Sequence, residues 1–332
     1  MLDRNVRGDD VPAMDEESSL RAAATKGDYG GQDEVDIVAK DGWCLPPTHR
    51  LARVGHVFPM HTTAARCEGE RWVESKTALP FRMCLADGED NISRHIAKTG
   101  MWEADETTRV DEYLRTAKKG TVVDVQAHLG WYTLLAAARG FRVAAFEPNA
   151  DLARRLVASV VANGWQERVS VYQALPADAD GIAWIRPSPL GTSRTWATPF
   201  GWEAGKLPED VRVRTVRLDD VVDKDASVPL IKFDAEGFLG RFASGAEATL
   251  ARTALLVAKM APAMEEANRC SPKRYGEWAL GAQLQLCSPD GLCGSAQAMA
   301  NVIEHMAVDV GADGVDLERL PFLFEYIHFK RA

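Results

Sequence analysis

The chain of 332 residues lacks the sequence features of a metal site or a disulfide framework. Its six cysteines form no C-x-x-C pair and its seven histidines do not cluster with them, so we expect no metal. Only the last two cysteines are close, on either side of a Pro-Asp-Gly turn, where a disulfide would fit but two buried thiols are expected. We interpret all six as reduced thiols of an intracellular protein: Cys44, Cys67, Cys84, Cys270, Cys287 and Cys293.

Long apolar runs and an excess of basic charge are also missing. No stretch is long enough to cross a bilayer, and the charged N-terminus has no apolar segment typical of a secretory signal. Acidic residues outnumber basic ones by 48 to 39, for a formal net charge of -9, which argues against nucleic acid as the main partner. We expect a cytoplasmic protein without a membrane span, whose 46% hydrophobic residues can bury a sizeable core.

The pattern of elements divides the chain into three parts. Residues 1–34 are polar and acidic and are predicted to be disordered or loosely attached. Residues 35–118 form an N-terminal extension, with helices over 91–98, capped by Asp90, and over 110–118 that are expected to pack over the sheet. Residues 119–332 alternate strands and helices, as in an α/β domain, and end in a pair of strands that suggests an antiparallel edge. Further helices are expected at 151–162, 245–251 and 275–282, and strands at 81–86, 122–125, 141–146, 169–173, 182–186, 211–216, 230–234, 255–260, 283–287 and 322–329.

The most informative stretch is Thr121–Asn149, which is predicted to form a strand, a tight turn, a helix and a second strand. Gly130 marks the turn, and Glu147 closes the second strand. Such a unit places backbone N–H groups at a helix N-terminus beside a carboxylate that can accept hydrogen bonds from ribose hydroxyls. The fingerprint G-x-G-x-x-G is absent, which argues against a nicotinamide-dependent oxidoreductase. The spacing alone leaves two interpretations open, a nucleoside site or a structural unit without a ligand.

Five motifs in order carry a resemblance: VVDVQAHLGWYT, AAFEPN, GTSR, VRLDD and LIKFDAEG. Together they resemble the FkbM family of S-adenosylmethionine-dependent methyltransferases, and the FEP triplet and the IKxDxEG segment are the most specific. The resemblance implies a Rossmann-like methyltransferase fold with a mostly parallel seven-stranded sheet, a reversed last strand and helices on both faces. It implies S-adenosylmethionine as cofactor and O-methylation of a hydroxyl on a small molecule, sugar or glycan.

The resemblance also implies a cofactor site at the ends of the first three core strands. The first turn should lie against the methionine half of the cofactor, Glu147 should hold the ribose hydroxyls, and the residues after it should flank the adenosine. Trp131 is expected to wall the pocket, although aromatic residues at such positions also pack in cores. The implied cofactor-binding residues are Asp124, Gln126, His128, Gly130, Trp131, Glu147, Pro148, Asn149 and Ala174.

The catalytic candidates follow the fourth core strand. A general base assists methylation of an alcohol because the hydroxyl proton must leave. We expect Asp234 to orient the acceptor or act as base, with Glu236 as the second candidate. Two alternatives stay open: Glu236 caps the following helix, or Asp234 pairs with Lys232 or Arg241. The aromatic, turn-rich insertion Pro187–Pro208 is either a substrate lid or an ordinary surface hairpin.

Three departures from the family pattern bear on activity. Gln126 stands where the family has glycine, and His128 where it has asparagine. A glutamate usual at the end of the fifth strand is replaced by Ala258 or Lys259, depending on register. Glycine allows a close approach and an unusual backbone conformation, which Gln126 with its Cβ does not share. Gln126 and the missing glutamate support the alternative of a catalytically impaired domain that acts as a binding or interaction module, whereas Glu147, Asp234 and Glu236 support an active enzyme.

Overall fold

The computed structural model describes residues 58–60, 65–86, 90–187, 195–198, 211–235, 237–259, 284–287, 293–294 and 326–331. The expectations for residues 1–34, for Glu236, for a helix over 275–282 and for most of the insertion 187–208 lie outside these residues. Within the described part, no helix is both long enough and apolar enough to cross a membrane.

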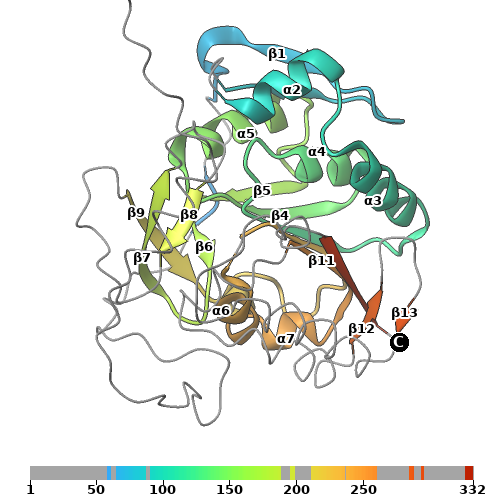
Figure 1. The fold of residues 1–332 in the computed structure, drawn as a ribbon, viewed down its shortest axis with the longest axis vertical. Helices are drawn as coiled ribbons and strands as arrows, with labels where there is room; N and C mark the ends of the chain where they lie inside the picture. The colour runs from blue at the N-terminus through green and yellow to red at the C-terminus, as the bar shows by residue number, and fades with distance from the viewer. Residues whose placement is uncertain are drawn as a thin grey trace, which may run out of the picture.

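An eight-stranded sheet forms the centre of the molecule (Figure 1). Its middle strands β11, β10, β3, β4 and β5 are parallel, and β14 runs antiparallel to β11, so the predicted reversed last strand is confirmed. The described sheet has eight strands rather than seven because a two-residue strand, β13, pairs with β12. The order is β13 (Cys293–Gly294), β12 (Leu284–Cys287), β14 (Tyr326–Arg331), β11 (Thr253–Lys259), β10 (Val228–Phe233), β3 (Thr121–Val125), β4 (Arg142–Phe146) and β5 (Val169–Tyr172).

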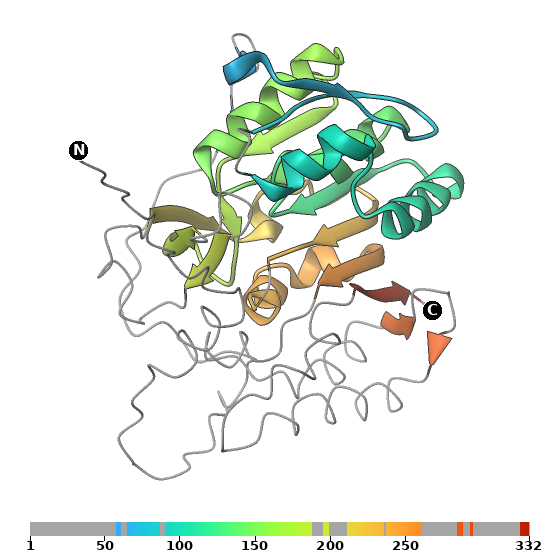
Figure 2. The same ribbon diagram turned by 45° about the horizontal axis from the view of Figure 1, so that its top comes forward.

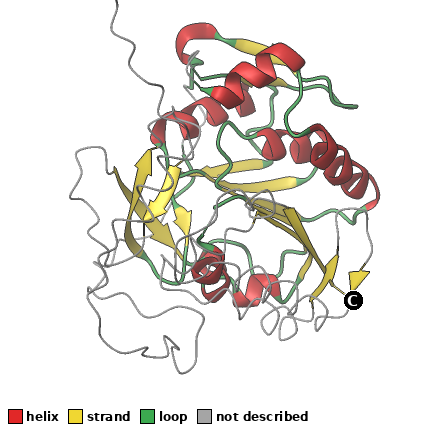
Figure 3. Cartoon of the chain, viewed as in Figure 1, coloured by secondary structure: helices red, strands yellow, loops and turns green. Residues whose placement is uncertain are grey.

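Helices cover both faces of this sheet (Figures 1 and 3). Residues of one strand alternate between two cores: Val123 and Val125 of β3 face one cluster, and Val122 faces the other. The second cluster also holds Leu134 of α4, beside which α3 and α5 pack. The helices are α2 (Asn91–Thr99), α3 (Ala104–Thr116), α4 (Trp131–Ala138) and α5 (Ala150–Ala162) on one side, and α6 (Leu239–Ser244) and α7 (Glu247–Leu250) on the other.

Local sequence signals explain where several of these elements begin. Asp90 accepts a hydrogen bond from the Ser93 backbone N–H and caps α2, as predicted. Gly130 precedes α4 with φ 87°, and a Cβ there would lie 2.1 Å from Leu156 Cδ1, so only glycine lets the turn approach α5 this closely. The predicted helix over 110–118 starts earlier, at Ala104.

A smaller four-stranded sheet lies beside the main one (Figure 2). Its strands are β6 (Leu175–Pro176), β9 (Val211–Val216), β7 (Gly181–Pro187) and β8 (Thr195–Thr198). Strands β7 and β9 are the pieces expected on either side of the insertion, and β8 lies within it and pairs with β7. The 3-10 turn η2 (Leu218–Asp220) leads from β9 toward β10.

The N-terminal extension contains an internal disulfide, and it packs against α5. Cys67 and Cys84 form a disulfide with a Cα–Cα distance of 5.6 Å, buried beside Ala158 of α5. The interpretation of these two cysteines as reduced thiols is therefore wrong. The pair is 17 residues apart, and pairing of β1 (Trp72–Glu74) with β2 (Arg82–Cys84), after the turn η1 (Glu68–Glu70), brings it together. The side chains of the other four cysteines lie outside the described residues.

Candidate active site

The sequence-predicted residues meet at the carboxyl edge of the parallel strands. Val125 of β3 is in register with Phe146 of β4 and with Phe233 of β10. The residues that follow these three positions therefore lie along one edge of the sheet, where ligands of open α/β sheets bind. Glu147 and Asp234 are the two carboxylates that directly follow β4 and β10.

The turn after β3 has an unusual backbone. Gln126 has φ 59° and His128 has φ 53°, both in the left-handed region that favours glycine. Gln126, where the family pattern has glycine, therefore adopts a conformation that glycine tolerates better, at a cost on the order of 1 kcal/mol. His128 Nε2 lies 3.9 Å from Asp90 Oδ1, so its ring faces the cap of α2.

Glu147 holds this turn to the start of α5. Its Oε2 accepts a hydrogen bond from the His128 backbone N–H at 2.7 Å, and its Oε1 accepts one from the Asn149 backbone N–H at 2.8 Å. The residue has 0% exposed surface. Burial raises the pKa of Glu147 to about 7, although both backbone hydrogen bonds act in the opposite direction. In this state Glu147 stabilises the turn, and a ribose would reach it only if the residues covering it moved.

Asp124 lies within β3, one residue before its carboxyl end, on the face of the sheet covered by α4. Thr133 of α4 donates a hydrogen bond to Asp124 Oδ2 at 2.6 Å, and the carboxylate is buried. Burial raises the pKa of Asp124 to about 6, while Thr133 and the charge of Lys232 oppose the rise and the charge of Asp234 adds to it. Asp124 is therefore fixed in place, with its charge coupled to both Lys232 and Asp234.

The other predicted cofactor residues border the same edge. Pro148 and Ala174 are buried, and Asn149 caps α5 by accepting hydrogen bonds from the backbone N–H groups of Asp151 and Leu152. Trp131 is also buried, and its indole N–H donates to Thr107 of α3 at 2.8 Å.

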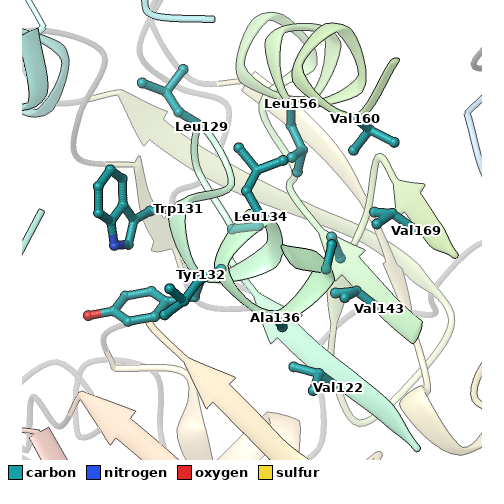
Figure 4. Packing of buried hydrophobic residues seen from close by; sticks show 14 of the residues in the cluster. Val122, Leu129, Trp131, Tyr132, Leu134, Ala136, Val143, Leu156, Val160 and Val169 are labelled. Atoms are coloured by element: carbon teal, nitrogen blue, oxygen red, sulfur yellow. The ribbon is translucent and has the colours of Figure 1, made fainter. Parts of the chain in front are cut away.

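Tyr132 is equally buried, and its hydroxyl donates to Glu103 Oε2 at 2.9 Å. Figure 4 shows the Trp131 and Tyr132 rings side by side at the start of α4, with Leu134 of the same helix packed near Leu156. Their polar atoms thus join α4 to α3 and to Glu103, which directly precedes α3.

Asp234 has a more open environment than Glu147, with 27% of its side chain exposed. Its Oδ2 lies 3.4 Å from Lys232 Nζ, and its Oδ1 lies 3.8 Å from Lys259 Nζ. Of the two partners considered from the sequence, Lys232 is therefore present, whereas Arg241 pairs with Asp178 at 2.8 Å.

The register at the end of β11 decides which residue lies beside Asp234. Phe233 pairs with Ala258, so Lys259 follows at the level of Asp234. Ala258 is buried in the core on the opposite face of the sheet. A cation thus lies beside Asp234, where the family pattern led us to look for an acid.

Sequence reasoning did not single out Glu106 and His328, which lie 222 residues apart in the chain. Glu106 of α3 is buried, and its Oε1 lies 3.1 Å from His328 Nε2 of β14. Burial would raise the pKa of Glu106, but the hydrogen bond and charge of His328, with the charges of Lys232 and Arg109, outweigh it and lower the pKa. The signal available in the sequence was the position of Glu106 one turn before Val110, on the face of α3 that becomes buried.

The comparison with protein families decides the class of this domain. Residues 124–257 match the model of the methyltransferase FkbM domain. The match covers less than half of the chain, and it identifies this central part as similar to the FkbM methyltransferase domain. The resemblance predicted from the motifs is confirmed, and the family identifies the cofactor as S-adenosylmethionine.

Solved structures are more distant. The S-adenosylmethionine-dependent methyltransferase from Agrobacterium tumefaciens is 10% identical with a TM-score of 0.35, covering 60% of this chain and 57% of its own. The ribosomal protein L11 methylase from Lactobacillus delbrueckii subsp. bulgaricus is 10% identical with a TM-score of 0.30, covering 68% of this chain and 80% of its own. A geranyl diphosphate methyltransferase is 14% identical with a TM-score of 0.35, and the match covers 74% of this chain and 83% of that protein. The chain thus spans little more than half of the Agrobacterium structure, and the family assignment rests on the sequence match. No curated protein matches the chain.

The residues at this edge fit S-adenosylmethionine in their chemistry. A carboxylate offers about four acceptor positions, and the two backbone N–H groups leave Glu147 with acceptor capacity for a ribose hydroxyl on each oxygen. Asn149 and Pro148 adjoin that carboxylate, and Asp124 lies at the next strand. Because Glu147 is covered, binding of the ribose requires a local movement.

Proposed function

We propose that the protein is an S-adenosylmethionine-dependent O-methyltransferase that acts on a hydroxyl of a small molecule, sugar or glycan. The observation that carries the proposal is the partly exposed carboxylate of Asp234, at the edge that also carries Glu147 in an FkbM-family domain. The bound cofactor would supply the methyl group: the acceptor oxygen would bond to the methyl carbon as the bond from that carbon to the sulfonium sulfur broke, which would leave S-adenosylhomocysteine.

Asp234 takes the proton in this proposal. An alcohol is a weak nucleophile until its proton is removed, and a carboxylate within hydrogen-bond reach can accept that proton as the new bond forms. The two ammonium groups at 3.4 and 3.8 Å hold the carboxylate at the strand end. Glu147, Asn149 and the turn at Gln126–Gly130 would hold the cofactor, with Glu147 on the ribose.

A second candidate is a catalytically impaired domain that serves as a binding module. The covered carboxylate of Glu147 favours it, and so does the side chain that Gln126 adds where the family has glycine, because both would oppose the entry of a ribose. The two candidates differ in whether the donor binds at all.

Thermal-shift titration tests the proposed function first. S-adenosylmethionine and S-adenosylhomocysteine should each raise the melting temperature with increasing concentration, because a ligand that binds only the folded state stabilises it. NADH serves as the control nucleotide and should give no shift. Release of S-adenosylhomocysteine with a panel of neutral and acidic sugars and phenols then tests turnover. Absence of any shift with either sulfur ligand would favour the binding module.

A further inference from the structure

A buried lysine lies between the cofactor side and the acceptor side of the candidate site. Lys232 of β10 is in register with Asp124 of β3, and both point to the face covered by α3 and α4. Its side chain is only 1% exposed. An ionised lysine is rarely buried unless its charge is balanced, so the groups around it show what it does.

The groups around Lys232 come from β3, α3, α4, β11 and β14 and from the residue that follows β10. Its Nζ lies 3.4 Å from Asp234 Oδ2 and 4.7 Å from the centre of the Tyr132 ring, whose face attracts cations. Its charge also lowers the pKa of Asp124 and of Glu106, against the effect of burial. The titratable and charged groups on the elements packed around Lys232 are Asp124, Asp234, Glu106 with its partners His328 and Arg109, Tyr132 with its partner Glu103, and Lys259.

We propose that Lys232 is a positioning residue for methyl transfer, whose ammonium group ties the carboxylate at the acceptor edge to the carboxylate of the cofactor strand. This inference rests on the proposed function, because it assigns Asp234 to the acceptor side and Asp124 to the cofactor side. Lys232 does not touch the reacting atoms. It keeps two acids, which would otherwise repel each other, charged and oriented toward their separate tasks.

The arrangement has a consequence that simple structural support would not have. An opposite charge within about 4–6 Å favours the ionised form of a carboxylate by roughly 1–3 pKa units. Removal of the ammonium should therefore change the pH at which the site works, in addition to the stability of the fold. The acid limb of the pH–rate profile should move to higher pH by about one unit or more.

The test compares Lys232→Met with Lys232→Arg. The control is Lys224→Met, because Lys224 is an exposed lysine. Lys232→Met should lower kcat about ten- to one-hundredfold, move the acid limb upward and change the acceptor KM less than threefold. Lys232→Arg keeps the charge and should return the limb to the wild-type pH. The affinity for S-adenosylhomocysteine, measured by calorimetry between pH 6 and 8, should become more dependent on pH in Lys232→Met.

If Lys232→Met does not fold, a double variant that leaves the net charge unchanged provides a second test. Lys232→Met with Asp124→Asn removes one charge of each sign, and its acid limb should still move upward, since Asp234 still lacks its closest cation. If the wild-type protein binds S-adenosylhomocysteine and turns over, an acid limb that does not move in folded Lys232→Met, or in the double variant, would overturn this inference alone. Failure of the wild-type protein to bind S-adenosylhomocysteine would overturn the proposed function and this inference with it.

Discussion

Two carboxylates lie at the same edge of one sheet, yet their surroundings differ. Glu147 is wholly buried, and each of its two carboxylate oxygens accepts a hydrogen bond from a backbone N–H group. The side chain of Asp234, in contrast, is 27% exposed and lies between the ammonium groups of Lys232 and Lys259. Parallel topology brings both acids to the edge, and local packing decides what each can do. The proposed cofactor side is therefore closed and held by backbone hydrogen bonds, whereas the proposed acceptor side is partly open and held by ion pairs.

The largest loss of turnover should follow substitution of Asp234, the partly exposed carboxylate. Asp234→Asn keeps the size of the side chain but removes the proton acceptor, so we expect turnover to fall about 10²- to 10⁴-fold. Affinity for S-adenosylhomocysteine should stay within a few-fold of the wild type, because Asp234 lies away from Glu147. Steady-state assay and calorimetry measure the two quantities. The exposed Asp225→Asn is the matched control, and unchanged turnover in folded Asp234→Asn would end the base assignment.

Removal of the closed-side acid should affect both stability and binding. Glu147→Ala leaves the backbone N–H groups of His128 and Asn149 without their acceptor, at about 1–3 kcal/mol each. We expect denaturant melts to show a loss of about 2–5 kcal/mol, and calorimetry to show at least tenfold weaker binding of S-adenosylhomocysteine. The exposed Glu247→Ala is the control. Wild-type affinity in a folded Glu147→Ala protein would refute the ribose role.

The pH dependence of the unfolding free energy tests whether Glu147 is as buried as the structure shows. Glu147 has its pKa raised from 4.5 to about 7 by burial, so the folded state binds a proton that the unfolded state has released between these values. Its contribution is fully present below about pH 4.5 and is lost as the pH rises through 7, about 3 kcal/mol in total. Asp124, raised to about 6, acts in the same direction. The difference in unfolding free energy between wild type and Glu147→Gln should therefore fall between pH 5 and 8. A constant difference would contradict a buried, raised Glu147.

The smallest effect concerns the turn that covers Glu147. Gln126→Gly removes a Cβ from a left-handed residue, and the relief of about 1–2 kcal/mol is partly offset by the greater freedom of glycine in the unfolded chain. We expect a net gain of about 0.5–1 kcal/mol in thermal melts and a tighter complex with S-adenosylhomocysteine. Gln126→Ala is the control, since it shortens the side chain but keeps the Cβ. Equal effects of both variants would show that the side chain, and not the backbone, obstructs the site.

The sequence predicted most of the central sheet because its strands are short apolar runs that end in recognisable signals. The Val122–Val125 run, Gly130 and the Phe146–Glu147 end located the β3-α4-β4 unit. Helix α6 was missed, since its Gly240 and the adjoining Gly237 and Gly245 interrupt any helical pattern.

The environment of the site could not be predicted from local pattern. Glu106 and His328 meet across 222 residues, and the Cys67–Cys84 pair depends on a hairpin that has no distinct turn motif. The lysine inside the apolar run of β10 was visible in the sequence, but its position between two acids depends on the register of β10 with β3. The covering of Glu147 likewise depends on how the turn folds back on the carboxylate.

The most direct measurement is a crystal structure of the protein with S-adenosylhomocysteine. We predict electron density for the ligand at the carboxyl ends of β3 and β4. Its ribose hydroxyls should lie within hydrogen-bond distance of Glu147, and the Gln126–Gly130 turn should have moved to admit the ligand. Crystals grown at saturating ligand that show no density there, with Glu147 still covered and bonded to His128 and Asn149, would contradict it.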